Sequence, residues 1–538
     1  MRRMSTCAEV IARTLKEAGI GSVFGLPGGE VLTLIEALRQ EDISFVLTRH
    51  EATAAFMADV TGQITGRPGV CLSTLGPGAT NLLSGVANAY LDRSPLLAIT
   101  GQMSTEALPF CSHQRIDLPA LFQPVTKAGI VMDAKDSRGA VRKAIAIATQ
   151  GRRGPVHIML PSNIARQEDE GNESREVPLE ESSPVLNQGL LEEAVGELAR
   201  ASHPLIILGI GVDPLATGEA INEFVEKTQI PVLTTPKAKG IVSESHPLFL
   251  ATAGGMAADE VVLELMEKAD LLVGIGFDPV ESDKMWHRQK KLLSIANASI
   301  AEGDYAPALQ LVGDVKVILG QILASYSPNH SWKEAEHRDF KSRMRAKLQP
   351  SASASSKGLS PYHLTLKLRQ ILSPSAVLTT DVGAHKLLLG QLWEAYEPLT
   401  FFMSNGLSSM GYGFPAAMAA RLQFPDREVV SVCGDGGFAM MLQDLETAVR
   451  LKLPLVCIVF CDNTMSLIRV VQSRREYPDY GVGFGGTNLA GIARGFGACG
   501  EKVDTLEDFE RAVAAGLRKK CPVVIEVPVD PEEYQKQI

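Results

Sequence analysis

Short runs of apolar residues alternate with helical patterns along the whole chain, and this alternation is the strongest constraint on the fold. Typical runs are residues 69–74, 204–209, 270–276 and 428–433. A strand that is apolar throughout must be covered on both faces, as in parallel sheets flanked by helices. The sequence therefore predicts an α/β protein with doubly wound parallel sheets.

Two segments of unusual composition divide the chain. Residues 166–184 are acidic and polar, and residues 346–361 are rich in Ser, Ala and Pro. Neither segment has the period of a helix or a strand, so both are expected to be exposed linkers. We therefore predict three domains of ordinary size, at residues 1–165, 185–345 and 362–538.

Composition excludes several classes of function. The 538 residues carry 52 basic and 62 acidic side chains, a net charge of −10, whereas nucleic-acid binding needs clustered Lys and Arg. No apolar run approaches the roughly 20 residues that span a bilayer, and the start lacks a signal-peptide pattern. The eight cysteines are scattered without a C-x-x-C pair, which is typical of free thiols in a reducing compartment. We expect a cytoplasmic enzyme.

The most informative segment contains two acidic residues at predicted strand ends. A strand ends in GDGG (434–437), a helix follows at roughly 441–451, and a second strand ends in CDN (461–463). Asp435 and Asp462 thus lie just past parallel strands, in the crevice where such sheets bind ligands. The glycines allow a phosphate to approach the backbone, and two carboxylates with a carbonyl suit Mg²⁺. The alternative is a tight glycine turn followed by an unrelated Asx turn.

This spacing resembles the signature of thiamine diphosphate (ThDP) enzymes, in which GDG is followed after about thirty residues by a pair of Asn or Asp. The resemblance covers essentially the whole chain and is closest to acetolactate synthases, above all to their catabolic form. It is carried by FGLPGG (24–29), RHEATAAFMADVTGQITGRPGVCLSTLGPGATN (49–81), AYLDRSPLLAITGQ (89–102), HQRIDLPALFQPVTK (113–127) and GFDPVESD (276–283). It implies three domains of the ThDP-binding fold: pyrimidine-binding, central and diphosphate-binding.

The resemblance also implies the residues that bind metal and cofactor. Mg²⁺ is expected at Asp435, Asp462 and the carbonyl of Thr464, with Asn463 as the ligand if the register is shifted by one. The expected ThDP contacts are Asp381, His385, Ser408, Met410, Gly434, Gly436 and Gly437. Met410 would bend the cofactor and the Ser408 carbonyl would accept from its amino group. Alternatively, Met410 is a core filler and His385 a surface residue.

Glu51 is the expected activating residue. ThDP becomes a nucleophile when C2 of its thiazolium loses a proton, and a carboxyl group at N1′ stabilises the tautomer that takes this proton. Glu51 lies in the first turn of a helix of small residues, after a strand that ends near Leu47. The alternative is a Glu placed there for its favourable interaction with the helix dipole. The order of the motifs along the chain favours the catalytic role.

The implied reaction is the decarboxylation of pyruvate and its carboligation to a second 2-oxo acid, giving 2-acetolactate. Gln114 would hold an intermediate by hydrogen bonds, with His113 beside it, although His113 also fits a surface loop. Lys127 is either a contact for the substrate carboxylate or a solvated charge. Arg469 is unexpected on the acceptor side of the pocket, where it could bind an anionic acceptor.

Three further expectations concern flavin, assembly and rival functions. Residues 277–280 (FDPV) lack the Arg that follows F-D-D in the flavin-containing form, so we expect no functional FAD. The resemblance implies a homodimer or homotetramer with active sites between subunits. The rivals are a ThDP carboligase or 2-oxo acid decarboxylase with another acceptor, such as a sulfoacetaldehyde acetyltransferase-like or carboxyethylarginine synthase-like enzyme, and a non-catalytic ThDP-fold scaffold.

Overall fold

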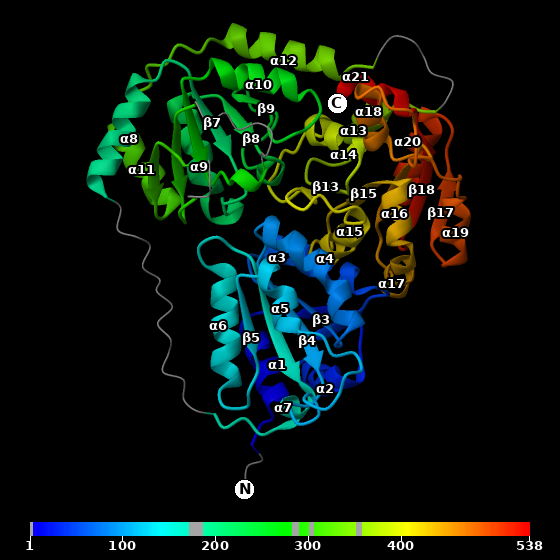
Figure 1. Cartoon of the computed structure of the whole chain (residues 1–538). Coiled ribbons are helices and arrows are strands. Elements are labelled where there is room, and N and C mark those ends of the chain that lie inside the picture. Colours follow the sequence, from blue (N-terminus) through cyan, green and yellow to red (C-terminus); the bar gives the residue numbers. More distant parts are fainter. Residues whose placement is uncertain (1–3, 172–186, 282–289, 301–305, 351–357) are drawn as a thin grey trace. The chain divides into compact units, whose positions relative to one another are not determined.

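The computed structural model describes residues 4–171, 187–281, 290–300, 306–350 and 358–538. Within these ranges the chain forms three six-stranded parallel sheets, one after another (Figure 1). The α/β class and the three parallel sheets are thereby confirmed. Most of the predicted linker 166–184, the middle of the predicted linker 346–361, and the end of the GFDPVESD segment lie outside the described residues.

The first sheet has the strand order β2-β1-β3-β4-β6-β5. One face packs on α1, α2 and α6, and the other on the buried pair α3 and α4, because its strands are apolar on both sides. The strands are β1 (Ser22–Gly25), β2 (Ser44–Leu47), β3 (Gly69–Ser73), β4 (Leu96–Gln102), β5 (Ala128–Val131) and β6 (Pro155–Pro161). The helices are α1 (Cys7–Glu17), η1 (Gly29–Val31), α2 (Leu32–Gln40), α3 (Glu51–Thr65), α4 (Pro77–Leu91), α5 (Leu118–Phe122), η2 (Gln123–Val125), α6 (Ser137–Thr149) and α7 (Ser162–Arg166).

The middle sheet has a different order, β12-β11-β10-β7-β8-β9, which is that of dinucleotide-binding sheets. Helices α8, α9 and α11 cover one face, and α10 and α12 cover the other (Figure 1). Its strands are β7 (Pro204–Leu208), β8 (Val232–Thr234), β9 (Phe249–Thr252), β10 (Leu271–Ile275), β11 (Leu292–Ala296) and β12 (Leu309–Val312). Its helices are α8 (Gln188–Arg200), α9 (Pro214–Thr228), η3 (Pro236–Ala238), α10 (Asp259–Lys268), η4 (Pro279–Glu281), α11 (Val315–Ser325) and α12 (Glu334–Leu348).

The third sheet, β14-β13-β15-β16-β18-β17, repeats the strand order of the first. Its strands are β13 (Val377–Thr380), β14 (Phe401–Met403), β15 (Val429–Gly434), β16 (Val456–Cys461), β17 (Cys499–Lys502) and β18 (Val523–Pro528). The helices of this part are α13 (Pro361–Ile371), α14 (Ala384–Leu392), α15 (Gly413–Gln423), α16 (Asp435–Met440), η5 (Leu442–Asp444), α17 (Leu445–Arg450), α18 (Ser466–Arg474), α19 (Leu489–Gly495), α20 (Leu506–Gly516), η6 (Pro531–Glu533) and α21 (Tyr534–Gln537).

Helical structure around the GDGG run begins earlier than the sequence predicts. The predicted range of roughly 441–451 contains η5 and α17, but a further helix, α16, precedes it and begins at Asp435 itself. The carboxylate of Asp435 accepts a hydrogen bond from the N–H of Gly436 (2.8 Å), and a carboxylate at a helix start stabilises the first turn. The glycines are therefore helical, and they do not form a separate turn.

The first residues of the acidic linker are held against the N-terminus. Thr6 and Glu168 form an antiparallel bridge, and the N–H of Asp169 donates to the carbonyl of Ser5 (2.9 Å). The carboxylate of Asp169 accepts from the N–H of Ser137 (2.9 Å), at the start of α6. Acidic composition indicated an exposed segment here, whereas Asp169 is buried because the helix start provides a partner.

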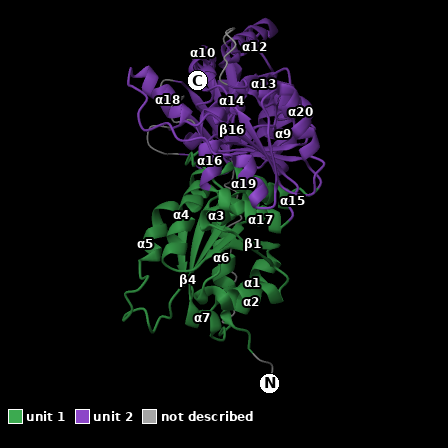
Figure 2. Cartoon of the chain, turned by 90° about the vertical axis from the view of Figure 1, so that its right-hand side faces the viewer, with its two compact units in different colours: residues 1–181, 406–425, 441–451 green, residues 182–405, 426–440, 452–538 purple. Residues whose placement is uncertain are grey.

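The chain divides into two compact units. Unit 1 contains residues 1–181, 406–425 and 441–451, and unit 2 contains the remainder (Figure 2). Two segments of the predicted third domain therefore belong with the first sheet. Hydrogen bonds explain this, because the N–H of Gly406 donates to Asp92 (2.7 Å) and Gln63 donates to the Tyr412 hydroxyl (3.4 Å).

Membrane segments and cysteines add two observations. Among the described residues there is no helix with the length and apolarity needed to cross a bilayer. All eight cysteines are free thiols, but only four of them are buried: Cys7, Cys71, Cys433 and Cys457.

Candidate active site

Glu51 is the first residue of α3 and is buried, with 4% of its surface exposed. Its Oε2 accepts a hydrogen bond from the side-chain amide of Asn81 (2.9 Å). The helix can be buried all round because it is made of small residues: a methyl group on Gly85 of α4 would lie only 2.4 Å from the Cβ of Ala55. A carboxyl group is thus held at a helix start in a largely apolar setting, as the sequence predicts.

Asp444 fixes the first turn of α3, and sequence reasoning missed it. Its carboxylate accepts from the N–H of Arg49 (2.7 Å), from the Thr53 hydroxyl (2.6 Å) and from the Thr447 hydroxyl (3.0 Å). Asp444 has no exposed surface, and burial raises the pKa of its carboxyl group although these donors oppose the change. Arg49 is 395 residues away, so no local pattern reveals the contact.

Gln114 and Glu51 each pack against a different glycine at the start of α4. A methyl group on Gly76 would lie 3.1 Å from the Cβ of Gln114, and one on Gly78 would lie 3.2 Å from the Glu51 carboxylate. Both side chains therefore lie against the start of α4, which has no side chains of its own at these two points. Gln114 has a φ of 54°, an unusual conformation for a non-glycine residue. Gln114 and His113, the predicted pair, are both exposed.

Ser408 and Met410 also belong to unit 1. The segment is anchored where Gly406 donates to the Asp92 carboxylate (2.7 Å). Ser408 is exposed with a φ of 54°, and Met410 is half-buried. Partial exposure does not fit a core-filling methionine, because such residues are fully covered.

In unit 2 the structure brings Asp435 and Asp462 together at the ends of adjacent strands. Strands β15 and β16 are paired in parallel, with Gly434 opposite Phe460. The Asp435 carboxylate accepts from the N–H groups of Asp462 (3.2 Å) and Asn463 (2.8 Å). Burial, with a contribution from the charge of Asp462, raises the pKa of Asp435 to about 6.

Residues that follow Asp462 in the chain orient its carboxylate by hydrogen bonds. One oxygen accepts from the N–H of Thr464 (3.1 Å), and the other accepts from the hydroxyl of Ser466 at the start of α18. Burial also raises the pKa of Asp462. A buried carboxylate, Asp435, and a half-buried one, Asp462, repel each other at neighbouring strand ends, and a divalent cation would relieve this repulsion. The donor set therefore fits Mg²⁺.

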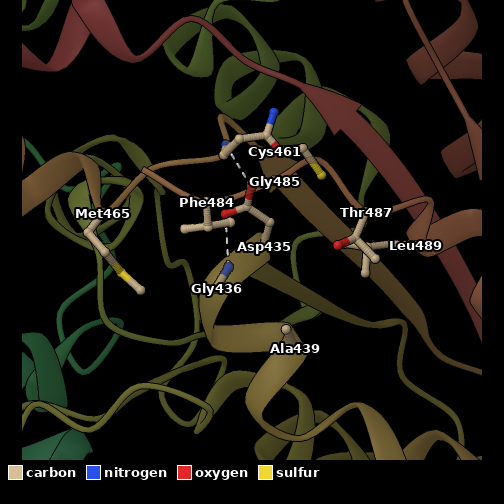
Figure 3. Close-up of a pocket in the computed structure, with 10 residues that line it drawn as sticks. Asp435, Gly436, Ala439, Cys461, Met465, Phe484, Gly485, Thr487 and Leu489 are labelled. Carbon is tan, nitrogen blue, oxygen red and sulfur yellow. Dashed lines mark hydrogen bonds between the residues drawn. The ribbon is translucent and has the colours of Figure 1, made fainter. Parts of the chain in front are cut away.

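A cavity of about 310 Å³ lies beside Asp435 (Figure 3). Part of its wall folds back on the residues that follow β16, because the N–H of Met465 donates to the Val482 carbonyl (2.8 Å) and the N–H of Phe484 donates to the Asn463 carbonyl (3.0 Å). The lining residues are Asp435, Gly436, Ala439, Cys461, Asn463, Met465, Phe484, Gly485, Thr487 and Leu489. Glycine and backbone N–H groups on a helix start suit a diphosphate group here.

Asp381 and His385 pack against the glycines of the GDGG run. Asp381 is fully buried and shares a hydrogen bond with His385 (3.0 Å), which is 6% exposed. His385 is therefore not a surface residue. The carboxylate of Asp381 would lie only 1.9 Å from a methyl group on Gly437, so a side chain at that position is excluded. The predicted cofactor contacts Asp381, Gly434 and Gly437 thus form one packed group.

Lys127 is a structural residue. Its ammonium group donates to the carbonyls of Ile147 and Gln150, in and just after the last turn of α6. A cation at a helix C-terminus binds carbonyls that have no other partner. Burial lowers the pKa of Lys127 to about 8. These contacts account for Lys127 without a substrate.

Comparison with known families identifies the class. The model for "Thiamine pyrophosphate enzyme, N-terminal TPP binding domain" matches residues 5–121. Those for the central domain and the C-terminal TPP binding domain match residues 191–322 and 381–527. The chain therefore belongs to the thiamine pyrophosphate enzyme family, whose cofactor is ThDP.

Three similar proteins are acetolactate synthases or a large subunit of one. The acetolactate synthase of Bacillus subtilis (strain 168) is 32% identical over 97% of this chain and 93% of its own length. The catabolic acetolactate synthase of Raoultella terrigena is 29% identical over 98% and 96%, respectively. The large subunit of acetolactate synthase isozyme 1 from Escherichia coli (strain K12) is 30% identical over 99% and 95%. The chain is an acetolactate synthase-like enzyme.

The first prediction concerns Asp444. The Asp444→Asn variant places an amide nitrogen where a carboxylate oxygen accepts a hydrogen bond. The first turn of α3 then loses its anchor, and Glu51 is misplaced. We expect turnover to fall by about 10²-fold, because small displacements of a catalytic group are costly. The matched control is Asp426→Asn, at an exposed position. Equal losses in the two variants, or none in Asp444→Asn, would contradict this role.

Proposed function

We propose that this enzyme uses ThDP and Mg²⁺ to decarboxylate pyruvate and to join the resulting two-carbon unit to a second 2-oxo acid, giving 2-acetolactate. The observation that carries the proposal is the buried Glu51 carboxyl group at the start of α3, which packs, like Gln114, against a glycine at the start of α4. The near full-length similarity to acetolactate synthases supports the choice of reaction.

The residues of unit 2 would hold the cofactor's charged end. Asp435, Asp462 and the carbonyl of Thr464 would bind Mg²⁺, and the Mg²⁺ would bind the diphosphate. The helix start of α16 would present N–H groups to the phosphate oxygens. His385 would contact the same group, held in place by Asp381.

The residues of unit 1 would act on the other end. Bound ThDP supplies the nucleophilic carbon and the electron sink. Glu51 would exchange a proton with a ring nitrogen of the pyrimidine, and burial keeps its carboxyl group away from bulk water. Met410 and the Ser408 carbonyl would set the cofactor's bend. Gln114 would orient the substrate by hydrogen bonds, with His113 at the exposed rim.

We also propose that the central sheet holds no functional FAD. Its first and fourth strands, β7 and β10, are adjacent, and a dinucleotide would bind beyond their carboxyl ends. There a methyl group on Gly209 would lie 2.5 Å from the Phe277 Cα, so the two turns are in close contact. The N–H of Ile210, of the kind that binds a pyrophosphate, donates to the Glu281 carboxylate (2.7 Å).

The second prediction tests the reaction. Incubated with pyruvate, ThDP and Mg²⁺, the enzyme should release 2-acetolactate, which acid converts to acetoin. Glu51→Gln should bind ThDP but lose exchange of the C2 proton for deuterium, with turnover reduced by at least about 10²-fold. Production of acetaldehyde and carbon dioxide alone would show a simple decarboxylase. A product formed only with another acceptor would show a related carboligase, and normal C2 exchange in Glu51→Gln would disprove the role of Glu51.

The third prediction separates the two candidate metal ligands. Asp462→Asn should weaken Mg²⁺-dependent ThDP binding by about 10–100-fold, because a neutral amide replaces a carboxylate in the metal site. Asn463→Ala should weaken it less than threefold. Titration of ThDP followed by tryptophan fluorescence, with and without a chelator, measures both. The reverse order of effects would identify Asn463 as the ligand.

Assembly is part of the proposal. Glu51 lies in one compact unit and the proposed metal ligands lie in the other. We propose that a homodimer or homotetramer is the active form, with Glu51 of one chain serving the metal site of a second copy, as in the family that the sequence resembles.

The fourth prediction follows from this arrangement. Glu51→Gln and Asp435→Asn are each expected to be inactive, but refolding them together should restore about one quarter of wild-type activity. Random pairing makes about half of the dimers mixed, and each mixed dimer keeps one intact site of two. Complementation is measured as 2-acetolactate formation per chain. No recovery, with mixed dimers shown by a tag on one variant, would place the whole site within one chain.

A further inference from the structure

One arginine joins the wall of the cavity to the C-terminal segment of unit 2. Residues 475–488, called the cavity wall segment below, connect α18 to α19 and contribute Phe484, Gly485 and Thr487 to the cavity lining. Arg469 lies on α18. Its Nε donates to Asp479 of the wall segment (2.8 Å) and its Nη2 donates to Glu532 of η6 (2.8 Å).

This contact contradicts the idea that Arg469 awaits an anionic acceptor. The guanidinium group is engaged on two sides by carboxylates, so its positive charge is already compensated. The planar guanidinium offers donors in fixed directions, and it therefore sets the positions of both partners relative to α18. Only 27% of the Arg469 side chain is exposed, which limits screening by water.

Other contacts show that α18 is the support of the wall segment. The side-chain amide of Gln472 donates to the carbonyl of Tyr480 (2.9 Å), and the N–H of Tyr477 donates to the carbonyl of Gln472 (2.9 Å). The first part of the segment packs weakly, because Tyr477 is 60% exposed and Tyr480 is 85% exposed, whereas Val482 further along is buried and its carbonyl accepts from the N–H of Met465. A segment with little buried surface depends on its few polar anchors.

We propose that Arg469 is a positioning residue that holds the cavity wall segment against the substrate side of the site by binding Asp479 and Glu532 together. The inference rests on the proposed function, since it assigns the cavity to the cofactor and substrate. Phe484 is five residues from Asp479, and its N–H bonds to the Asn463 carbonyl beside the metal site. Release of Asp479 would therefore loosen the wall next to the reacting groups.

The experiment combines a local structural readout with kinetics. Chymotrypsin cleaves after aromatic residues that are not followed by proline, so cleavage after Tyr480 in the full-length enzyme reports opening of the wall segment. We expect Arg469→Gln to raise the cleavage rate by about tenfold, Asp479→Asn to raise it similarly, and the double variant to exceed neither. Arg469→Lys, which offers no planar fork, should fall between wild type and Arg469→Gln.

The kinetic expectation is a several-fold rise in the KM for pyruvate, with kcat changed less than threefold. The matched control is Arg511→Gln, which removes an exposed pair with Asp508 on α20 and should change neither readout. Asp479→Asn keeps the test valid if Arg469→Gln folds poorly, because Asp479 is 52% exposed.

Three outcomes would overturn the proposal. Unchanged cleavage in Arg469→Gln and Asp479→Asn would show that the pair does not hold the wall segment. A raised KM in Arg469→Gln with normal cleavage would show that Arg469 binds substrate directly. Equal cleavage in Arg511→Gln would indicate general loosening. The cleavage readout does not depend on 2-acetolactate formation, so failure of the proposed reaction is recognised separately.

Discussion

The parallel pairing of β15 with β16 is the constraint on which the candidate site of unit 2 depends. Because the two strands run side by side in register, the residues that follow them emerge at the same edge, and Asp435 meets the backbone of Asp462 and Asn463. Everything else in unit 2 that bears on the site is arranged around this junction. Asp381 and His385 pack against the GDGG run. The backbone of the cavity wall segment forms hydrogen bonds with Asn463 and Met465.

Carboxylates withdrawn from water are the main electrostatic feature of the candidate site. The chain carries a net charge of −10, yet the acidic residues at the site are separated from water, and burial raises the pKa of Asp435, Asp444 and Asp462. The three are compensated differently. Asp444 is satisfied by donors from Arg49, Thr53 and Thr447, whereas Asp435 and Asp462 lie close enough for their charges to oppose each other, which is the arrangement that a divalent cation would stabilise. Local charge, and not the overall charge, therefore carries the function.

Much of the site could be predicted because its signals are local. A strand, a glycine run and an aspartate lie within a few residues of one another around Asp435, and Glu51 opens a helix directly after a short strand. The features that could not be predicted depend mostly on contacts between residues far apart in the chain. The helix predicted at roughly 441–451 corresponds to η5 and α17, whereas α16 was not predicted, because the sequence does not show that Asp435 begins a helix of its own. Asp444 was missed because its partners lie at the other end of the chain, and Arg469 was misread because Asp479 and Glu532 come together only in the folded unit.

The sequence by itself determined the class of fold, the order of the three sheets along the chain, the family and the chemical groups available for catalysis. These follow from hydrophobic period, glycine placement and spacing, which are properties of neighbouring residues. Only the tertiary structure decided which carboxylates lie close together, that segments 406–425 and 441–451 join the first sheet, and what Arg469 contacts. Those facts depend on hydrogen bonds and burial between residues far apart in the chain, and no local pattern encodes them.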